Sequence, residues 1–101
     1  MSKYAVITRA VYGPEGRHKA EEMASRLDSI YRTQPGYQRA DYLSFDDTTG
    51  EFGSVVLFDT RAHAESAFQA SQAVREQTTR QLGIMRRGTP ERRIVEVLSL
   101  R

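Results

Sequence analysis

Apolar positions along the chain follow two different spacings. Four short runs are rich in β-branched and aromatic residues, which is typical of strands. They span residues 4–12, 37–46, 52–58 and 94–100. Between them, apolar residues recur at intervals of three and four, which predicts an amphipathic helix from about Pro14 to Thr33 and a second helix that runs to about Leu82. The predicted order is therefore β-α-β-β-α-β.

Turn-forming residues separate these predicted elements. Gly13-Pro14-Glu15-Gly16 interrupts the chain after the first strand, and Pro14 suits the first turn of the helix that follows. Pro35-Gly36 ends that helix, and the segment 46–50 predicts a hairpin between the second and third strands. Asp59 or Thr60 can cap the second helix. Before the fourth strand, residues 83–93 are rich in Arg, Gly and Pro, and we expect a solvated loop there.

The strands do not alternate cleanly between apolar and polar residues. In the first strand, Val6 and its even-numbered neighbours point one way, yet Ile7 and Val11 on the other side are apolar too. The third and fourth strands show the same pattern. An antiparallel sheet with one wet face should alternate, and two helices can cover only one face. We therefore expect a second copy of the chain to cover the other face, giving a homodimer through sheet faces.

Composition narrows the class of protein. At 101 residues, with 39% hydrophobic and 28% charged residues, the chain is expected to form a single folded domain over residues 1–101. The absence of cysteine and of an apolar membrane-length run predicts a cytoplasmic protein without a membrane partner. Residues 75–101 carry seven arginines and three glutamates. No aromatic residue lies among those arginines, so nucleic acid is not the expected partner.

Three features resemble the antibiotic biosynthesis monooxygenase family. They are the apolar strand leading into a long amphipathic helix, the segment Gln34-Pro35-Gly36-Tyr37, and the sequence VVLFDTRAHAESAF at residues 55–68. This resemblance spans nearly the whole chain and implies a ferredoxin-like α+β fold with both helices on one face of an antiparallel sheet. It also implies a dimeric α+β barrel and a pocket between helices and sheet. Known members include cofactor-independent oxygenases of polyphenols and enzymes that degrade haem.

The resemblance places three residues at family site positions. The haem-degrading branch uses an Asn, a Trp and a His where this chain has Thr8, Phe58 and about Gln77, and the chain contains no Asn or Trp. Gln77 cannot replace an imidazole as an iron ligand, so haem degradation is not expected. In a cofactor-independent site, Phe58 can stack on a flat ring and Gln77 can hydrogen-bond a phenol or quinone oxygen. Ordinary core packing also explains Phe58.

Other residues are candidates for acid–base chemistry or ligand binding. His63 lies beside the inner stripe of the second helix and is the better candidate base, although a capping or surface role remains open. His18 is predicted to face solvent. Tyr42 and Arg9 can bind a substrate carbonyl or anion, or can belong to the dimer interface. No metal or cofactor is expected. Asp46-Asp47 resembles a pair of metal ligands, but we interpret it as part of a turn.

The resemblance and these residues together lead to three hypotheses for the function. The first is a cofactor-independent monooxygenase, or a binder, of aromatic or quinone-like small molecules, with His63 and Gln77 as catalytic candidates and Thr8, Arg9, Tyr42 and Phe58 as substrate-binding candidates. The alternative is a non-catalytic dimeric ligand-binding or regulatory module of the same fold. A third hypothesis is an interaction protein that uses the arginine-rich end.

Overall fold

The computed structural model describes residues 3–85 and 87–98. Six elements follow one another along the chain. They are β1 (Lys3–Val11), α1 (Arg17–Tyr31), β2 (Tyr37–Asp46), β3 (Glu51–Phe58), α2 (Arg61–Gln81) and β4 (Arg87–Val97). The β-α-β-β-α-β order predicted from the apolar spacing is confirmed.

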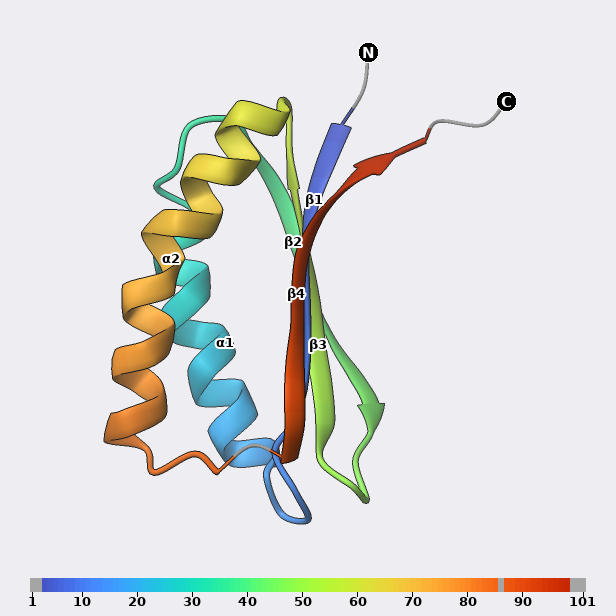
Figure 1. Ribbon diagram of the computed structural model, residues 1–101, viewed down its shortest axis with the longest axis vertical. Coiled ribbons are helices and arrows are strands. Elements are labelled where there is room, and N and C mark those ends of the chain that lie inside the picture. The colour runs from blue at the N-terminus through green and yellow to red at the C-terminus, as the bar shows by residue number, and fades with distance from the viewer. Residues whose placement is uncertain (1–2, 86, 99–101) are drawn as a thin grey trace.

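The four strands form one antiparallel sheet in the order β2-β3-β1-β4. The central strands β1 and β3 pair along their whole length, from Tyr4 opposite Phe58 to Val11 opposite Glu51. Both helices pack on the same face of the sheet, as Figure 1 shows, and no helix of the described residues covers the other face. This arrangement is the ferredoxin-like α+β fold expected from the sequence.

The hydrophobic core lies between the two helices and the inner face of the sheet. Side chains of the central strands meet the buried stripes of α1 and α2 there. The core comprises Val6, Val56 and Phe58 of the sheet, Met23, Leu27 and Tyr31 of α1, Ala64 and Ala67 of α2, and Ile84. Each large aliphatic side chain buried in this way contributes about 1.5–3 kcal/mol. The even-numbered positions of β1 and β3 therefore face the helices.

Helix α1 begins later than the sequence predicts. Pro14 does not occupy the first helical turn, because the helix starts at Arg17 with Gly16 as its N-cap. Glu15 has a φ of 63°, a left-handed conformation that is incompatible with a right-handed helix. A Cβ atom on Gly16 would lie 2.5 Å from that of Tyr12, so only glycine lets the turn pack this closely against the end of β1.

Strand β4 begins earlier than the sequence predicts. The segment expected to be a loop is instead the first half of the strand, which starts at Arg87 and pairs with β1. β4 is an edge strand, where Pro90 is tolerated because one side of the strand needs no hydrogen bonds. The pairing of β4 with β1 is irregular in this segment, with a register shift between Arg9 and Val11 and a φ of 72° at Gly88. Residues 99 and 100 of the predicted strand lie outside the described residues.

Helix α2 begins where the sequence predicts. Thr60 is the N-cap, and its hydroxyl accepts a hydrogen bond from the backbone N–H of His63 at 3.1 Å. The helix continues without a break to Gln81. No helix among residues 3–85 and 87–98 combines the length and the apolar character that crossing a membrane requires.

The outer face of the sheet carries a strip of apolar side chains. Ile7, Val55, Leu57 and Val95 are half-buried, and Phe45 at the edge is 49% exposed. No other part of the described chain covers this face. The odd-numbered positions of the strands therefore leave a surface that a monomer does not bury.

Candidate functional site

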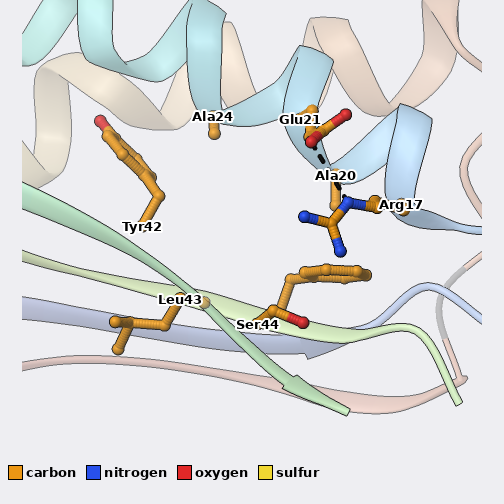
Figure 2. Close-up of a pocket in the computed structure, with 9 residues that line it drawn as sticks. Arg17, Ala20, Glu21, Ala24, Tyr42, Leu43 and Ser44 are labelled. Atoms are coloured by element: carbon orange, nitrogen blue, oxygen red, sulfur yellow. Dashed lines mark hydrogen bonds and ion pairs between the residues drawn. The ribbon is translucent and has the colours of Figure 1, made fainter. Parts of the chain in front are cut away.

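A cleft opens between α1 and the inner face of the sheet at β2 and β3 (Figure 2). Its volume is about 150 Å³. Ala20 and Ala24 line it from the helix side, and their small side chains leave the space open. Figure 2 shows Tyr42 rising from β2 toward α1, whereas Leu43 points to the opposite side of the strand. The ring of Phe52 also lines the cleft, which gives it one aromatic wall on each of two adjacent strands.

Charged side chains lie at the mouth of this cleft. The Nε atom of Arg17 lies 3.3 Å from Glu21 Oε2 on the next helical turn, and its Nη1 atom lies 3.2 Å from Asp47 Oδ1 in the β2–β3 turn. All three side chains are well exposed. Exposed ion pairs of this kind contribute little to stability, so their effect is to place both signs of charge where a ligand would enter.

Tyr42 contributes a hydroxyl group to the cleft. Its O–H donates a hydrogen bond to Oδ1 of Asp28 at 2.9 Å. Burial raises the pKa of Tyr42, and the hydrogen bond and negative charge of Asp28 raise the pKa further. Tyr42 therefore stays protonated at neutral pH. Its oxygen can still accept a hydrogen bond from a ligand while its proton points to Asp28.

The cleft narrows inward to a recess of about 30 Å³. Met23 and Leu27 close it from the helix side, and the lining residues with a hydroxyl group are Thr8, Tyr12, Tyr42 and Ser54. The Oγ1 atom of Thr8 is enclosed and has no hydrogen-bond partner among the described residues. A buried hydroxyl without a partner costs free energy, so this unpaired group on a residue that lines the recess needs an explanation.

Arg92 of β4 lies directly opposite Thr8 in the β1–β4 register. Its guanidinium carbon lies 4.0 Å from the centre of the Phe68 ring. Its Nη2 atom donates to the backbone oxygen of Phe68 at 3.1 Å, to the hydroxyl of Tyr31 at 3.4 Å and to Ser71 Oγ. The Nε atom is enclosed and has no partner in the described part of the chain. No carboxylate of the described residues forms an ion pair with Arg92.

The structure brings two of the sequence-predicted site residues together. Thr8 and Tyr42 both line the recess, from β1 and β2 respectively. Phe58 lies elsewhere on the same face, fully buried, with the rings of Tyr31 and Tyr37 against it at centroid distances of 6.3 Å each. Phe58 has the packing of a core residue, which was the second explanation open for it.

The other three candidates lie outside the cleft. His63 is near the start of α2, where its Nδ1 atom lies 2.7 Å from Asp59 Oδ1. Gln77 is exposed on α2, and its neighbour Thr78 is the residue that turns inward. Arg9 is on the outer face of the sheet, where it pairs with Glu51 and lies over the ring of Phe45. His18 is exposed on α1, as expected.

Sequence reasoning missed Arg92 and Phe52. The signal for Arg92 was present, because residue 92 has the same parity as Ile94 and so faces the helices once the strand is extended backward. Phe52 was assigned to the third strand without a role. Among residues 3–85 and 87–98, no three His, Asp or Glu side chains group as a metal site would require.

A scan against models of protein families finds no match to this chain, and a search of curated protein sequences finds none either. Solved structures do match. A Streptomyces coelicolor monooxygenase from the gene ActVA-Orf6, crystallised with the ligand Nanaomycin D, is 25% identical with a TM-score of 0.71, and the match covers 98% of this chain and 89% of that one.

Two further structures span nearly the same region. SnoaB, a cofactor-independent oxygenase from Streptomyces nogalater, is 16% identical with a TM-score of 0.69, over 98% of this chain and 95% of that one. A protein from Nitrosomonas europaea, named as a candidate antibiotic biosynthesis monooxygenase, is 18% identical with a TM-score of 0.73, over 95% of this chain and 90% of that one. The chain therefore has the fold of the antibiotic biosynthesis monooxygenases, and the resemblance predicted from its sequence is confirmed at the level of the fold.

Proposed function

We propose that this chain is a cofactor-independent monooxygenase of the antibiotic biosynthesis monooxygenase family, and that its cleft binds a hydroxylated aromatic or quinone-like molecule. The observation that carries the proposal is the pairing of an aromatic-walled cleft with an enclosed Thr8 hydroxyl for which the described residues provide no partner. A ligand oxygen at this position would satisfy the hydroxyl. The fold shared with SnoaB and with the Streptomyces coelicolor monooxygenase adds support.

The size of the cleft limits the ligand. A cavity of about 150 Å³ in another protein holds benzene, so this cleft accommodates one aromatic ring. Further fused rings would extend through the open mouth past Arg17 and Glu21. A flat ring fits between the walls formed by Tyr42 and Phe52, where aromatic pairs gain about 0.5–1.5 kcal/mol beyond burial.

The proposed reaction requires few chemical groups from the protein. An electron-rich hydroxylated ring can supply the electrons itself. One atom of O2 replaces the single hydrogen of a ring carbon and becomes a quinone carbonyl, the phenol C–O–H becomes the second carbonyl, and the other atom of O2 leaves as water with the two hydrogens. The ring must first lose a phenolic proton. The phenol oxygen can donate to Tyr42, whose own proton is directed at Asp28 Oδ1 2.9 Å away. Tyr42 and Asp28 thus form a route by which that proton leaves the ring.

The apolar outer face of the sheet supports a homodimer as part of the same proposal. Ile7, Val55, Leu57 and Val95 would be covered if two copies packed sheet against sheet. Sedimentation equilibrium should give twice the chain mass at micromolar concentration. Leu57→Asp should give a monomer, whereas Gln72→Asp on the exposed side of α2 should remain dimeric. A wild-type monomer would contradict the dimer.

Oxygen uptake tests the enzymatic part. A panel of dihydroxynaphthalenes and anthrones should be consumed with O2 by the wild-type chain. Ala24→Leu, which fills the cleft, should abolish both binding and uptake, whereas Ala62→Leu on the exposed side of α2 should change neither. The variants His63→Ala and Gln77→Ala test the two catalytic candidates from the sequence, and the position of their side chains outside the cleft predicts activity close to wild type.

The non-catalytic alternative gives a different result in the same assays. A binding or regulatory module would retain the ligand in the wild-type chain and release it in Ala24→Leu, with no oxygen consumed by either. Binding without uptake across the whole panel would therefore contradict the oxygenase and support the alternative.

A further inference from the structure

We infer that Thr8 and Arg92 form an oxyanion subsite at the inner end of the cleft, and that the ligand binds there as a phenolate rather than as a neutral phenol. This inference rests on the proposed function and names the ionisation state of the aromatic molecule that the cleft takes. It follows from two enclosed polar atoms that lie on facing residues of neighbouring strands.

The first observation is the position of those atoms. Thr8 Oγ1 and Arg92 Nε are both enclosed, and neither has a hydrogen-bond partner in the described part of the chain. Thr8 and Arg92 are directly opposite each other in the β1–β4 register, so both side chains lie on the helix-facing side with Cβ atoms about 4.5–5.5 Å apart. Unpaired polar atoms are rare in protein interiors, and two on facing residues point to one shared partner.

The second observation is the charge balance around Arg92. Its neighbours are the Phe68 ring and the neutral oxygens of Phe68, Tyr31 and Ser71. Among the described residues no carboxylate neutralises this partly buried guanidinium. Partly buried charges are normally paired, so the site lacks an anion. By contrast, Arg9 of β1 and Arg93 of β4 each have a glutamate partner on the outer face.

The third observation is the size of the recess. At about 30 Å³ it holds an oxygen atom but not a ring, since a water molecule needs about 10–15 Å³. The ring would therefore lie in the outer part of the cleft with one oxygen directed inward. That oxygen would accept a hydrogen bond from Thr8. Arg92 does not line the recess, but it lies opposite Thr8 on the neighbouring strand, so the oxygen would lie in the field of its guanidinium. Both effects stabilise an ionised oxygen more than a neutral one.

The consequence is a preference for acidic phenols. Hydrogen bonds to a charged group, together with a cation nearby, are expected to favour the anion by about tenfold or more over the matched neutral ligand. The same preference lowers the apparent pKa of the bound phenol by about one unit. A residue that only stabilises the fold would not change the ionisation of a ligand, so this shift separates a binding role from a structural one.

Two quinones test the subsite. 2-Hydroxy-1,4-naphthoquinone is ionised at neutral pH and 1,4-naphthoquinone is neutral, and the visible band of the former reports its ionisation. Titrations followed by absorbance should show that the wild-type chain binds the hydroxyquinone about tenfold more tightly and lowers its pKa. Arg92→Gln should remove most of this preference while 1,4-naphthoquinone still binds. Arg93→Gln, on the same strand but facing outward, should keep it.

Thr8→Val provides a second variant that does not alter the charge. It should reduce the preference severalfold even if Arg92→Gln folds poorly. Equal affinity of the wild-type chain for both quinones, or an unchanged preference in both Thr8→Val and Arg92→Gln, would overturn the oxyanion subsite alone. Failure of the wild-type chain to bind either quinone would contradict the proposed function and the subsite together.

Discussion

Replacing Thr8 by valine should make the protein more stable while it weakens ligand binding. The substitution exchanges a hydroxyl for a methyl group of nearly the same shape, on a central strand where both residues have high strand propensity. Thr8 Oγ1 is enclosed and has no partner among the described residues, so folding removes its hydration without replacement. Leaving a buried hydroxyl unsatisfied costs about 1–3 kcal/mol, and valine would not incur this cost.

The expected gain in the stability of Thr8→Val is large enough to measure in a chain of this size. A change of about 1 kcal/mol shifts the melting temperature of a domain with 60–100 residues by roughly 4–8 °C. Urea denaturation should show a higher midpoint with an unchanged slope. The wild-type chain and Thr8→Val must be compared at one protein concentration, because the stability of the proposed dimer would depend on that concentration.

Ser71→Ala is the matched control for this experiment. Ser71 is also fully buried, but its hydroxyl donates to the backbone oxygen of Phe68 at 3.0 Å and accepts from Arg92. Removing a hydroxyl that has partners should destabilise the chain by about 1 kcal/mol. If Thr8→Val lowers stability as Ser71→Ala does, Thr8 has a structural partner and the argument for a ligand oxygen in the recess is refuted.

Three other predictions concern the cleft and the start of α2. Gly36→Ala should destabilise the chain by at least about 1–2 kcal/mol in urea denaturation. Gly36 has a φ of 78°, and a Cβ atom there would lie 2.0 Å from Asp59 Oδ1. An unchanged midpoint would show that the loop adapts. The hydrogen bond from His63 lowers the pKa of Asp59 below its usual 3.8. This carboxylate therefore adds stability above about pH 4 that is lost as pH falls through the lowered value. The acid limb of a pH–stability profile should flatten in His63→Ala, and an identical limb would contradict the pairing. Asp28→Asn should lower the pKa of Tyr42, so tyrosinate absorbance should appear at a lower pH than in the wild type. This absorbance change should be absent from Tyr42→Phe. A titration curve unchanged by Asp28→Asn would show that Asp28 does not act on Tyr42.

Much of the fold follows from local patterns in the sequence. Strand β2 begins and ends at the residues predicted, Tyr37 and Asp46, because Gly36 and the 46–50 turn mark both ends. The start of α2 is equally clear from the capping residue Thr60. The start of α1 was misplaced because the positive φ of Glu15 is a property of the tertiary turn and no residue type signals it.

Strand β4 shows where local signals fail. Gly88 and Pro90 are typical of loops, and only pairing with β1 across the sheet makes their segment a strand. The sequence pattern placed Arg92 in a solvated loop, so its position facing the helices was not predicted. Pairing partners are distant in sequence, so their effect on a weak local pattern is invisible without the fold.

The candidate site could be predicted in part. Thr8 and Tyr42 were identified from the sequence and meet at the recess. Gln77 and its neighbour Thr78 differ by one position, and on a helix one position rotates a side chain by about 100°. An alignment by short motifs cannot fix a helical face to that precision, and Thr78 is the residue that turns inward.

Binding in the cleft is the central claim, and an amide chemical-shift titration with 2-hydroxy-1,4-naphthoquinone tests it most directly. The largest shifts should fall on residues around the cleft on three elements, including Thr8 of β1, Ala24 of α1 and Tyr42 of β2. Small shifts there, with large ones on the outer face of the sheet or around His63 and Gln77, would contradict the account.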